Sequence, residues 1–264
     1  MGAGMTPTQI AEAWTLVDRQ QLAELALSGP PLVFATISGA HLYGFASRDS
    51  DVDLRGAFLY PLREVLQLYP PVETITVEEK TGFDLDWVAH DLRKFVRMLT
   101  EANGYVLEQL YSPLVVFESP TFLDLRELAR GCITKGAADH FRGFGRGRRK
   151  RLHEPEPTLK HALYGYRAYL AGIHLMRTGE VLSNLSRLNE IFRLPVVDEL
   201  IERKRQGVEK EALSVTEITY HDAALSALEF VLGEAYEASS LPEVVSGVAA
   251  LQDLVVEARL ETLV

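Results

Sequence analysis

Hydrophobic residues are spaced in two different ways along this chain, and the spacing changes near residue 91. Before that point, short runs rich in β-branched and aromatic residues predict four strands, over 31–38, 50–60, 72–79 and 83–90. A turn is expected at residues 80–82, between the last two runs. Ahead of the strands, apolar residues at helical spacing predict one helix of about 20 residues from Thr8 to Gly29, with Pro7 in its first turn.

After residue 91, apolar residues recur every three or four positions and predict helices, with no further strand. The expected helices cover residues 91–102, 104–112, 122–141, 158–181, 184–192, 196–207 and about 225–263. Residues 142–157 interrupt this pattern with charged, Gly and Pro residues, which a linker, a loop or the start of a basic helix would each explain. This interruption is the best candidate for a domain boundary.

The order of these elements predicts an α+β fold. An N-terminal head, with a small mixed sheet flanked by helices, is expected over residues 1–141, and an all-helical C-terminal domain over 142–264. No apolar run approaches the roughly 20 residues that cross a bilayer, so no membrane-spanning protein is expected. The single cysteine, Cys132, excludes an internal disulfide framework and fits a reducing compartment, so we expect a cytoplasmic protein.

Two aspartates share one face of the strand predicted over residues 50–60. Side chains alternate along a strand, so Asp51 and Asp53 project from the same side. Like charges at that spacing repel unless a cation lies between them, and Mg²⁺ prefers carboxylate oxygens. Asp84 and Asp86 offer a third carboxylate on a later strand, as a two-metal site for phosphoryl or nucleotidyl transfer requires. A solvated strand edge is the alternative explanation for the aspartate pair alone.

The residues just after the first predicted strand favour the metal interpretation. Ser38 and Gly39 lie where a strand gives way to a short helix, a place where backbone N–H groups can approach an anion. Gly39 also lacks the side chain that would block a phosphate. A glycine turn and three carboxylates therefore fit one reaction class, transfer of a phosphorus-containing group.

These motifs resemble the DNA polymerase β nucleotidyltransferase superfamily. The stretches SGAHLYG and SDVDLRG, LRKFVRML, NGYVLEQLYSP, KHALYGYR and GIHLMRTGEV resemble more closely the predicted nucleotidyltransferases associated with bacterial RNA repair. The similarity spans about residues 34–190. It implies an enzyme dependent on Mg²⁺ or Mn²⁺ that transfers NMP from an NTP, most simply ATP, to a hydroxyl group and releases pyrophosphate.

The resemblance also implies roles for individual carboxylates. Asp51 and Asp53 match the paired metal ligands of the superfamily. Asp86 best matches the third catalytic and metal-binding carboxylate, because it stands eight positions before Lys94, the spacing expected for the family. Asp84 remains the competing choice.

A further set of residues is expected to bind the nucleotide: Ser38, Gly39, Ala40, His41, Ser50, Arg55, Lys160 and Tyr164. Ala40 departs from the superfamily, which has Ser after the glycine, so phosphate contact would fall to Ser38, His41 or backbone amides. His41 has a structural hydrogen-bonding role as its alternative. Arg55 is expected to face away from the aspartates, either paired with an acid or against substrate. Lys160 and Tyr164 share one face of a helix. The resemblance implies that Lys160 lies near the triphosphate and Tyr164 near the base or sugar. The alternative is that this helix face simply packs against neighbouring helices.

The acceptor of the transferred group is the most open part of the prediction. A basic run is expected to bind nucleic acid, through Arg146, Arg148, Arg149, Lys150 and Arg151, which favours an RNA end as acceptor. A solvated charged segment is the alternative. The net charge of −10 argues against a uniformly basic surface and leaves two rivals open, an adenylyltransferase for a protein or small molecule and a non-catalytic nucleotide sensor. The intact Asp51 and Asp53 count against the sensor.

Overall fold

The computed structural model describes residues 5–47, 50–79, 84–206 and 212–262, which fold as a mixed α and β protein. Two compact units are present. The sheet unit comprises Pro7–Leu42, Asp51–Thr134 and Val244–Val264. The helical unit comprises Lys135–Glu243 with Tyr43–Ser50 and the N-terminal residues up to Thr6. None of the helices in the described ranges has the length and hydropathy needed to span a bilayer.

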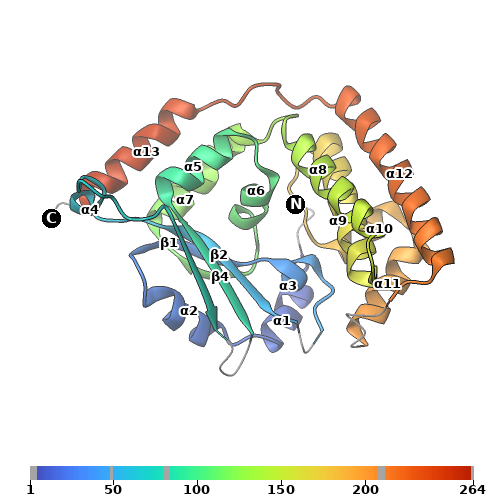
Figure 1. The fold of residues 1–264 in the computed structure, drawn as a ribbon. Helices are drawn as coiled ribbons and strands as arrows, with labels where there is room; N and C mark the ends of the chain where they lie inside the picture. The colour runs from blue at the N-terminus through green and yellow to red at the C-terminus, as the bar shows by residue number, and fades with distance from the viewer. Residues whose placement is uncertain (1–4, 48–49, 80–83, 207–211, 263–264) are drawn as a thin grey trace. The chain divides into compact units, whose positions relative to one another are not determined.

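A five-stranded mixed sheet forms the centre of the sheet unit (Figure 1). Its strands, in the spatial order β3-β4-β2-β1-β5, are β1 Leu32–Ile37, β2 Val52–Phe58, β3 Thr74–Glu79, β4 Leu85–Asp91 and β5 Val115–Glu118. Strands β2 and β4 pair in parallel, and the other neighbours pair antiparallel. The four predicted strands are confirmed, whereas β5 was not predicted. The turn expected at residues 80–82 lies outside the described residues.

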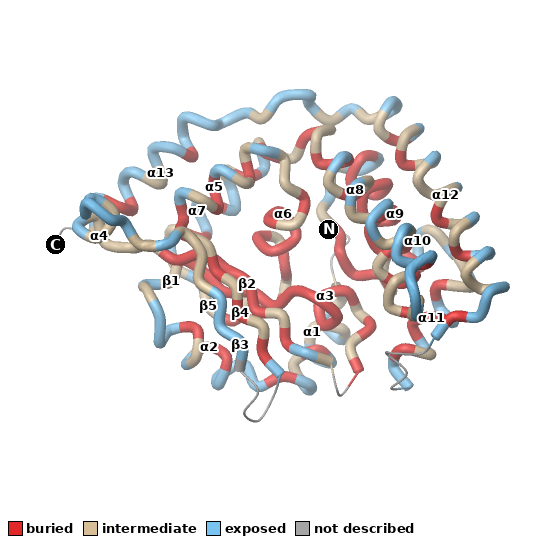
Figure 2. The backbone as a smooth tube through the Cα atoms, in the orientation of Figure 1, coloured by how far each residue is buried: buried red, intermediate tan, exposed pale blue. Residues whose placement is uncertain are grey.

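Helices cover both faces of this sheet. The helices of the sheet unit are α1 Pro7–Thr15, α2 Arg19–Leu27, α3 Gly39–Tyr43, α4 Leu62–Val65, α5 Leu92–Thr100, α6 Gly104–Leu110, α7 Pro120–Leu128, the 3₁₀ helix Ala129–Cys132, and α13 Val248–Glu261. In Figure 1, α5, α6 and α7 lie on one side of the strands and α2 on the other. Phe34 of β1 packs against the helices on the first of these sides. Its ring contacts Phe95 of α5 and Phe122 of α7 at centroid distances of 5.2 and 4.8 Å. Figure 2 shows the central strands and α6 coloured mostly as buried.

The expected helix from Thr8 to Gly29 is two helices, α1 and α2. Asp18 explains the break, because its carboxylate accepts hydrogen bonds from the backbone N–H groups of Gln20 and Gln21 at 3.0 and 3.1 Å. Such an N-cap satisfies the free donors of a new first turn and so favours a restart over one continuous helix.

The helical unit is built around one buried helix, α9. Its helices are α8 Ala137–Arg151, α9 Leu159–Thr178, α10 Leu185–Phe192, α11 Pro195–Arg205 and α12 Val215–Ala238. Two glycines of α9 allow the neighbouring helices to approach closely. A Cβ atom at Gly172 would lie 2.8 Å from Phe141 of α8, and one at Gly165 would lie 2.9 Å from Leu225 of α12. Larger residues at either position would push these helices apart.

The elements after residue 120 differ from the expected ones in two places. The helix expected over 122–141 is α7, the 3₁₀ helix and the first turn of α8. The charged run after residue 142 is regular helix as far as Arg151, the end of α8, and residues 152–157 lie between α8 and α9. The single helix expected over 225–263 is α12 and α13, and α13 belongs to the sheet unit.

Helix α13 is held to the sheet unit by a buried ion pair. The guanidinium of Arg259 donates to both oxygens of Asp91, at 2.8 and 3.0 Å, and to the backbone carbonyl of Tyr60. Asp91 also caps α5 by accepting from the N–H of Arg93 at 3.0 Å. Its side chain is 4% exposed and that of Arg259 is 9% exposed. One carboxylate therefore ties the end of β4, the start of α5 and the C-terminal helix together.

Candidate functional site

Asp53 and Asp86 lie directly opposite each other on the two parallel strands of the sheet. The register pairs Val52 with Leu85 at the start of the two strands and Asp53 with Asp86 one residue later. Both aspartates are partly exposed, with 19% of the Asp53 side chain and 40% of the Asp86 side chain accessible. Two carboxylates near the N-terminal ends of neighbouring inner strands are hard oxygen ligands of the kind that Mg²⁺ and Mn²⁺ prefer.

Arg55 lies between these two carboxylates. Its Nη2 donates to Asp53 Oδ1 at 2.6 Å and to Asp86 Oδ2 at 2.7 Å. The expectation that Arg55 faces away from the aspartates was wrong, because residues two apart on β2 share a face. The expected pairing with an acid is present, but with the site carboxylates themselves. Tyr105 of α6, which the sequence did not single out, accepts from Arg55 Nε at 2.6 Å.

Gly39 packs directly against Asp53. A Cβ atom at position 39 would lie 1.7 Å from Asp53 Oδ2, so no side chain fits there without displacing the carboxylate. The backbone φ of Gly39 is +58°, in the left-handed region that glycine adopts most easily. The Ser38 N–H donates to the backbone carbonyl of Asp53 at 2.8 Å, which fixes the turn to β2. The glycine turn and Asp53 are therefore in direct contact.

The other residues of the turn are buried. Ser38, Ala40 and His41 are 1%, 4% and 4% exposed. The Ser38 hydroxyl is buried and has no hydrogen-bond partner among the described residues. A hydroxyl in that state lacks about 1–3 kcal/mol of hydrogen-bond compensation, which a ligand oxygen or water can supply. The superfamily hydroxyl missing at Ala40 therefore has a possible substitute two residues earlier.

The remaining carboxylates lie at the ends of the strands. Asp51 precedes β2 and is exposed. Asp84 precedes β4, is also exposed, and its backbone carbonyl accepts from the N–H of Val52 at 2.7 Å. Asp86, rather than Asp84, therefore lies opposite Asp53. Within the described ranges, no three His, Cys, Asp or Glu side chains are already gathered as metal ligands.

The predicted nucleotide-binding residues of α9 lie in the helical unit, in a cluster of aromatic and basic side chains. The Tyr164 ring has Lys160 Nζ at 5.8 Å and Arg148 Cζ at 5.2 Å from its centroid. Three further rings surround that of Tyr164, at centroid distances of 5.4 Å for Phe45, 5.8 Å for Tyr43 and 6.5 Å for Phe144. Ser50, the other predicted residue in this unit, lies elsewhere: its hydroxyl contacts that of Ser47 at 3.1 Å.

Arg148 is the most unusual cation of this cluster. Burial and the like charges of Arg151 and Arg167 lower the pKa of its guanidinium below the ordinary value. Its ring contacts are with Phe144 and Tyr164, at 4.7 and 5.2 Å from the centroids. Neighbouring cations that repel one another are suited to bind an anion, and aromatic rings beside them are suited to stack on a planar base.

The structure divides the predicted nucleic-acid-binding run between different faces of α8. Arg146 and Arg149 point to α12, where they pair with Glu229 and Asp222 at 2.5 and 2.7 Å. These two arginines stabilise helix packing. The rest of the run comprises Arg148, just described, and the exposed Lys150 and Arg151.

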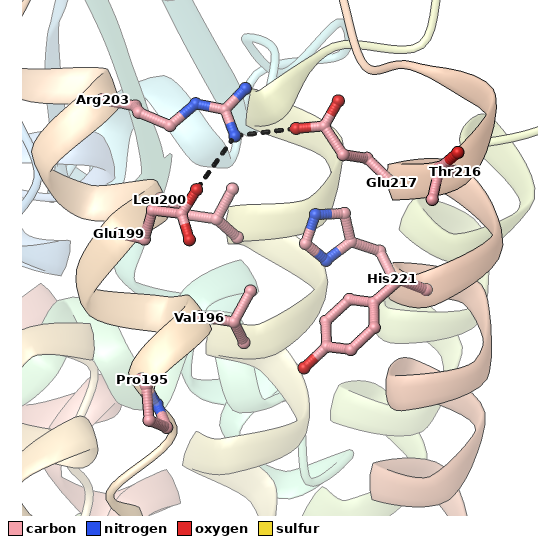
Figure 3. A pocket seen from close by; sticks show the side chains of 9 residues that line it. Pro195, Val196, Glu199, Leu200, Arg203, Thr216, Glu217 and His221 are labelled. Carbon is pink, nitrogen blue, oxygen red and sulfur yellow. Dashed lines mark hydrogen bonds and ion pairs between the residues drawn. The ribbon is translucent and has the colours of Figure 1, made fainter.

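A cavity of about 450 Å³ opens between α11 and α12 (Figure 3). Its wall includes an ion-pair network in which Arg203 contacts Glu217 at 2.8 Å and Glu199 at 3.6 Å. His221, 2% exposed, shares a hydrogen bond of 3.1 Å with the Tyr166 hydroxyl. The arginine in the wall is thus neutralised by two carboxylates of its own unit.

Glu217 should cause the helical unit to lose stability at acidic pH. Hydrogen bonds from the Ser214 hydroxyl and N–H, and then from Arg203, lower the pKa of Glu217 from 4.5 to about 2. Because the folded pKa is depressed, the stabilisation is complete above about pH 4.5 and is lost as pH falls through about 2. Acid unfolding followed by circular dichroism should therefore show a steeper loss of stability in the native protein than in Glu217→Gln.

Glu199→Gln is the matched control for this experiment. It removes a carboxylate that contacts the same Arg203 but is 66% exposed, at the longer distance of 3.6 Å. Exposed pairs of this kind contribute little, so its acid unfolding curve should follow that of the native protein. Identical curves for the two variants would contradict the role given to Glu217.

The sheet unit has the arrangement of a polymerase β-like nucleotidyltransferase, with a glycine turn after β1 and carboxylates opposed on β2 and β4. Comparison with known families shows which family within this class the chain matches. The sequence model of RlaP, described as the RNA repair pathway DNA polymerase beta family, matches residues 14–257. The chain therefore belongs to this family of polymerase β-like nucleotidyltransferases of RNA repair.

Two curated proteins are similar over much of the chain. The uncharacterized protein MJ0002 of Methanocaldococcus jannaschii is 33% identical over 178 residues, which cover 65% of this chain and 72% of that protein. The uncharacterized protein YcgL of Bacillus subtilis is 29% identical over 190 residues, which cover 69% of this chain and 72% of that protein. The relationship thus extends to archaeal and bacterial proteins.

Proposed function

We propose that this protein is a nucleotidyltransferase dependent on a divalent metal, which transfers NMP from an NTP, most simply ATP, to a hydroxyl group and releases pyrophosphate. The observation that carries the proposal is the direct opposition of Asp53 and Asp86 beside Gly39. Their carboxylate oxygens fit Mg²⁺ or Mn²⁺, with Asp51 as the additional ligand. The metal, when bound, would acidify the attacking hydroxyl and neutralise the leaving phosphates.

The chain's own residues have distinct tasks in this proposal. Gly39 allows the turn to pack directly against Asp53, and the buried Ser38 hydroxyl is the group of this turn that would donate to a phosphate oxygen. Asp86 is the more exposed of the two opposed carboxylates, at 40% against 19% for Asp53. It is therefore the better placed of the two to accept the proton of the attacking hydroxyl.

An RNA 3′ end is the acceptor that we propose. The family is one of an RNA repair pathway, and the helical unit presents Lys150 and Arg151 to solvent. Phosphate contacts by such residues and stacking of bases on exposed rings are the usual means of holding single-stranded RNA. The acidic net charge of −10 keeps a protein or small-molecule acceptor as the rival to be tested.

The test is a transfer assay with each α-labelled NTP, Mg²⁺ or Mn²⁺, a pool of RNAs and a cell extract depleted of RNA. Label in RNA supports the proposal, whereas label in protein or in small molecules identifies the rival adenylyltransferase. Binding of NTP without transfer of label under any of these conditions would contradict catalysis and favour a nucleotide sensor.

Reversing the charge of Lys150 and Arg151 should weaken RNA binding selectively. The double variant Lys150→Glu and Arg151→Glu is expected to lower RNA affinity by about tenfold or more. It should also make the plot of log K against log salt concentration less steep, by about one unit of slope for each lost phosphate contact. Filter binding across a salt series measures both. The affinity for NTP should stay unchanged.

The control variant reverses Arg130, an exposed arginine of the sheet unit that lies outside the basic run. Arg130→Glu makes the net charge more negative, as the test variant does, without touching residues 146–151, and should leave RNA affinity within about twofold. An unaltered salt dependence in the Lys150 and Arg151 variant would remove the support for RNA from this surface.

A further inference from the structure

Arg55 holds the place between Asp53 and Asp86 that the proposed function gives to a divalent ion. A single nitrogen, Nη2, is within hydrogen-bond distance of both carboxylates, at 2.6 and 2.7 Å. The Arg55 side chain is 8% exposed, and the carboxylates are more accessible to solvent than the guanidinium that joins them. This explains why the two aspartates can lie opposite each other without strong repulsion.

The rest of the guanidinium is fixed to the protein rather than to the carboxylates. Nε donates to the Tyr105 hydroxyl at 2.6 Å, and Nη1 donates to the backbone carbonyls of Leu54 and Asp86 at 2.8 and 2.5 Å. Among these bonds of Arg55, the two from Nη2 are those that another cation on the carboxylates would replace. The anchored guanidinium would stay close to the site after that exchange.

The Arg55 guanidinium carries its positive charge throughout, because a guanidinium is not deprotonated in proteins. When a metal ion approaches, this charge either stays on the two carboxylates or faces the metal ion.

We propose that Arg55 is the internal counter-ion of the Asp53 and Asp86 pair, that a divalent ion displaces its Nη2, and that Tyr105 retains the displaced guanidinium. This inference rests on the proposed metal site and adds a consequence to it. Arg55 lowers the affinity for the free metal ion, so that metal enters efficiently only together with the negative charges of a triphosphate. The site is thereby kept intact, but inactive, until the metal–nucleotide complex arrives.

The test measures Mn²⁺ binding by titration calorimetry, without nucleotide, to the native protein and to Arg55→Gln. Removal of the competing charge should tighten Mn²⁺ binding by about tenfold or more, because unit charges at such short separations interact by several RT even at the effective dielectric of a protein. Without metal the variant should melt at a lower temperature, since its carboxylates repel. Mn²⁺ should then raise its melting temperature more than it raises that of the native protein.

Two further variants separate competition from a purely structural role. Arg55→Lys keeps the charge and should bind Mn²⁺ as weakly as the native protein. Tyr105→Phe removes the anchor for Nε and lets the displaced guanidinium move away, so it should bind Mn²⁺ more tightly than the native protein but less tightly than Arg55→Gln. The comparison of Tyr105→Phe with the native protein keeps the inference testable if Arg55→Gln does not fold. Equal Mn²⁺ affinity in all four proteins would overturn the inference.

Asn variants distinguish failure of this inference from failure of the proposed function. Asp53→Asn and Asp86→Asn should each abolish Mn²⁺ binding in the Arg55→Gln background. If Mn²⁺ still binds in those variants, the metal is not held by these carboxylates, and both the proposed metal site and the counter-ion role of Arg55 are wrong. If the carboxylates are required but Arg55 makes no difference to affinity, the counter-ion role alone is wrong.

Discussion

Asp53→Asn should reduce the rate of nucleotidyl transfer by more than about a hundredfold. Loss of a residue that merely orients a metal ligand costs 10- to 100-fold, and Asp53 would be a direct ligand that also lies against the triphosphate turn. The amide retains an oxygen that can accept from Arg55 Nη2, so the fold should survive. The measurement is the initial rate of label transfer from NTP at saturating Mg²⁺, with circular dichroism to check the fold.

Asp84→Asn provides the matched comparison for this variant. Asp84 lies just before β4, two residues from Asp86, and its structural contact is made by the backbone carbonyl, which the substitution leaves in place. Its transfer rate should remain within a few-fold of the native rate, whereas Asp86→Asn should lose activity like Asp53→Asn. A large loss in Asp84→Asn together with an active Asp86→Asn would reverse the assignment of the third carboxylate.

Arg259→Met should destabilise the protein by about 3–5 kcal/mol. Removing one partner of a buried pair leaves an uncompensated charge, here the Asp91 carboxylate at 4% exposure. The loss would also free α13 from β4 and α5. Urea unfolding of the native protein and the variant gives the difference in free energy of unfolding.

The control for this prediction is an exposed ion pair in the same unit. Arg130 and Glu127 are 71% and 68% exposed at 3.1 Å, so Arg130→Met should cost less than about 1 kcal/mol. A cost below 1 kcal/mol for Arg259→Met as well would show that α13 contributes little to the stability of the sheet unit.

The opposition of Asp53 and Asp86 shows what the sequence could and could not predict about the site. Strand alternation and the glycine turn predicted where these residues lie on their own strands. Their register depends on β2 pairing in parallel with β4, a contact between distant segments that local periodicity does not contain. The sequence therefore left Asp84 as a competitor of Asp86, and the pairing supports Asp86 as the proposed third carboxylate.

Arg55 and Arg149 show that local sequence also cannot predict side-chain partners that lie far away along the chain. The Arg55 anchor, Tyr105, lies 50 positions along the chain, and the Arg149 partner, Asp222, lies 73 positions away. A basic run looks uniform in sequence, but a helix sends neighbouring residues to different faces. The packing of α8 against α12 determines which arginines of the run meet an acid, Arg146 and Arg149.

The fold errors also have physical causes. Strand β5 has only four residues, Val115–Glu118, and lies between helical segments, so its own pattern is too short to distinguish strand from helix. These residues form a strand because they pair, antiparallel, with the side of β1 that does not face β2. Helix α13 was grouped with the helices before it by chain order, whereas its buried Arg259 places it with the sheet unit.

The central claim is that this chain transfers NMP to a free hydroxyl by loss of pyrophosphate at the Asp53 and Asp86 site. The most direct measurement is product analysis by mass spectrometry, with one NTP, Mg²⁺ and matched RNAs that end in a 3′ hydroxyl or a 3′ phosphate. The account predicts RNA extended by NMP and an equal amount of pyrophosphate, with the 3′-hydroxyl RNA alone. Release of NDP with an RNA that carries the γ-phosphate, or equal reaction of the 3′-phosphate RNA, would contradict it.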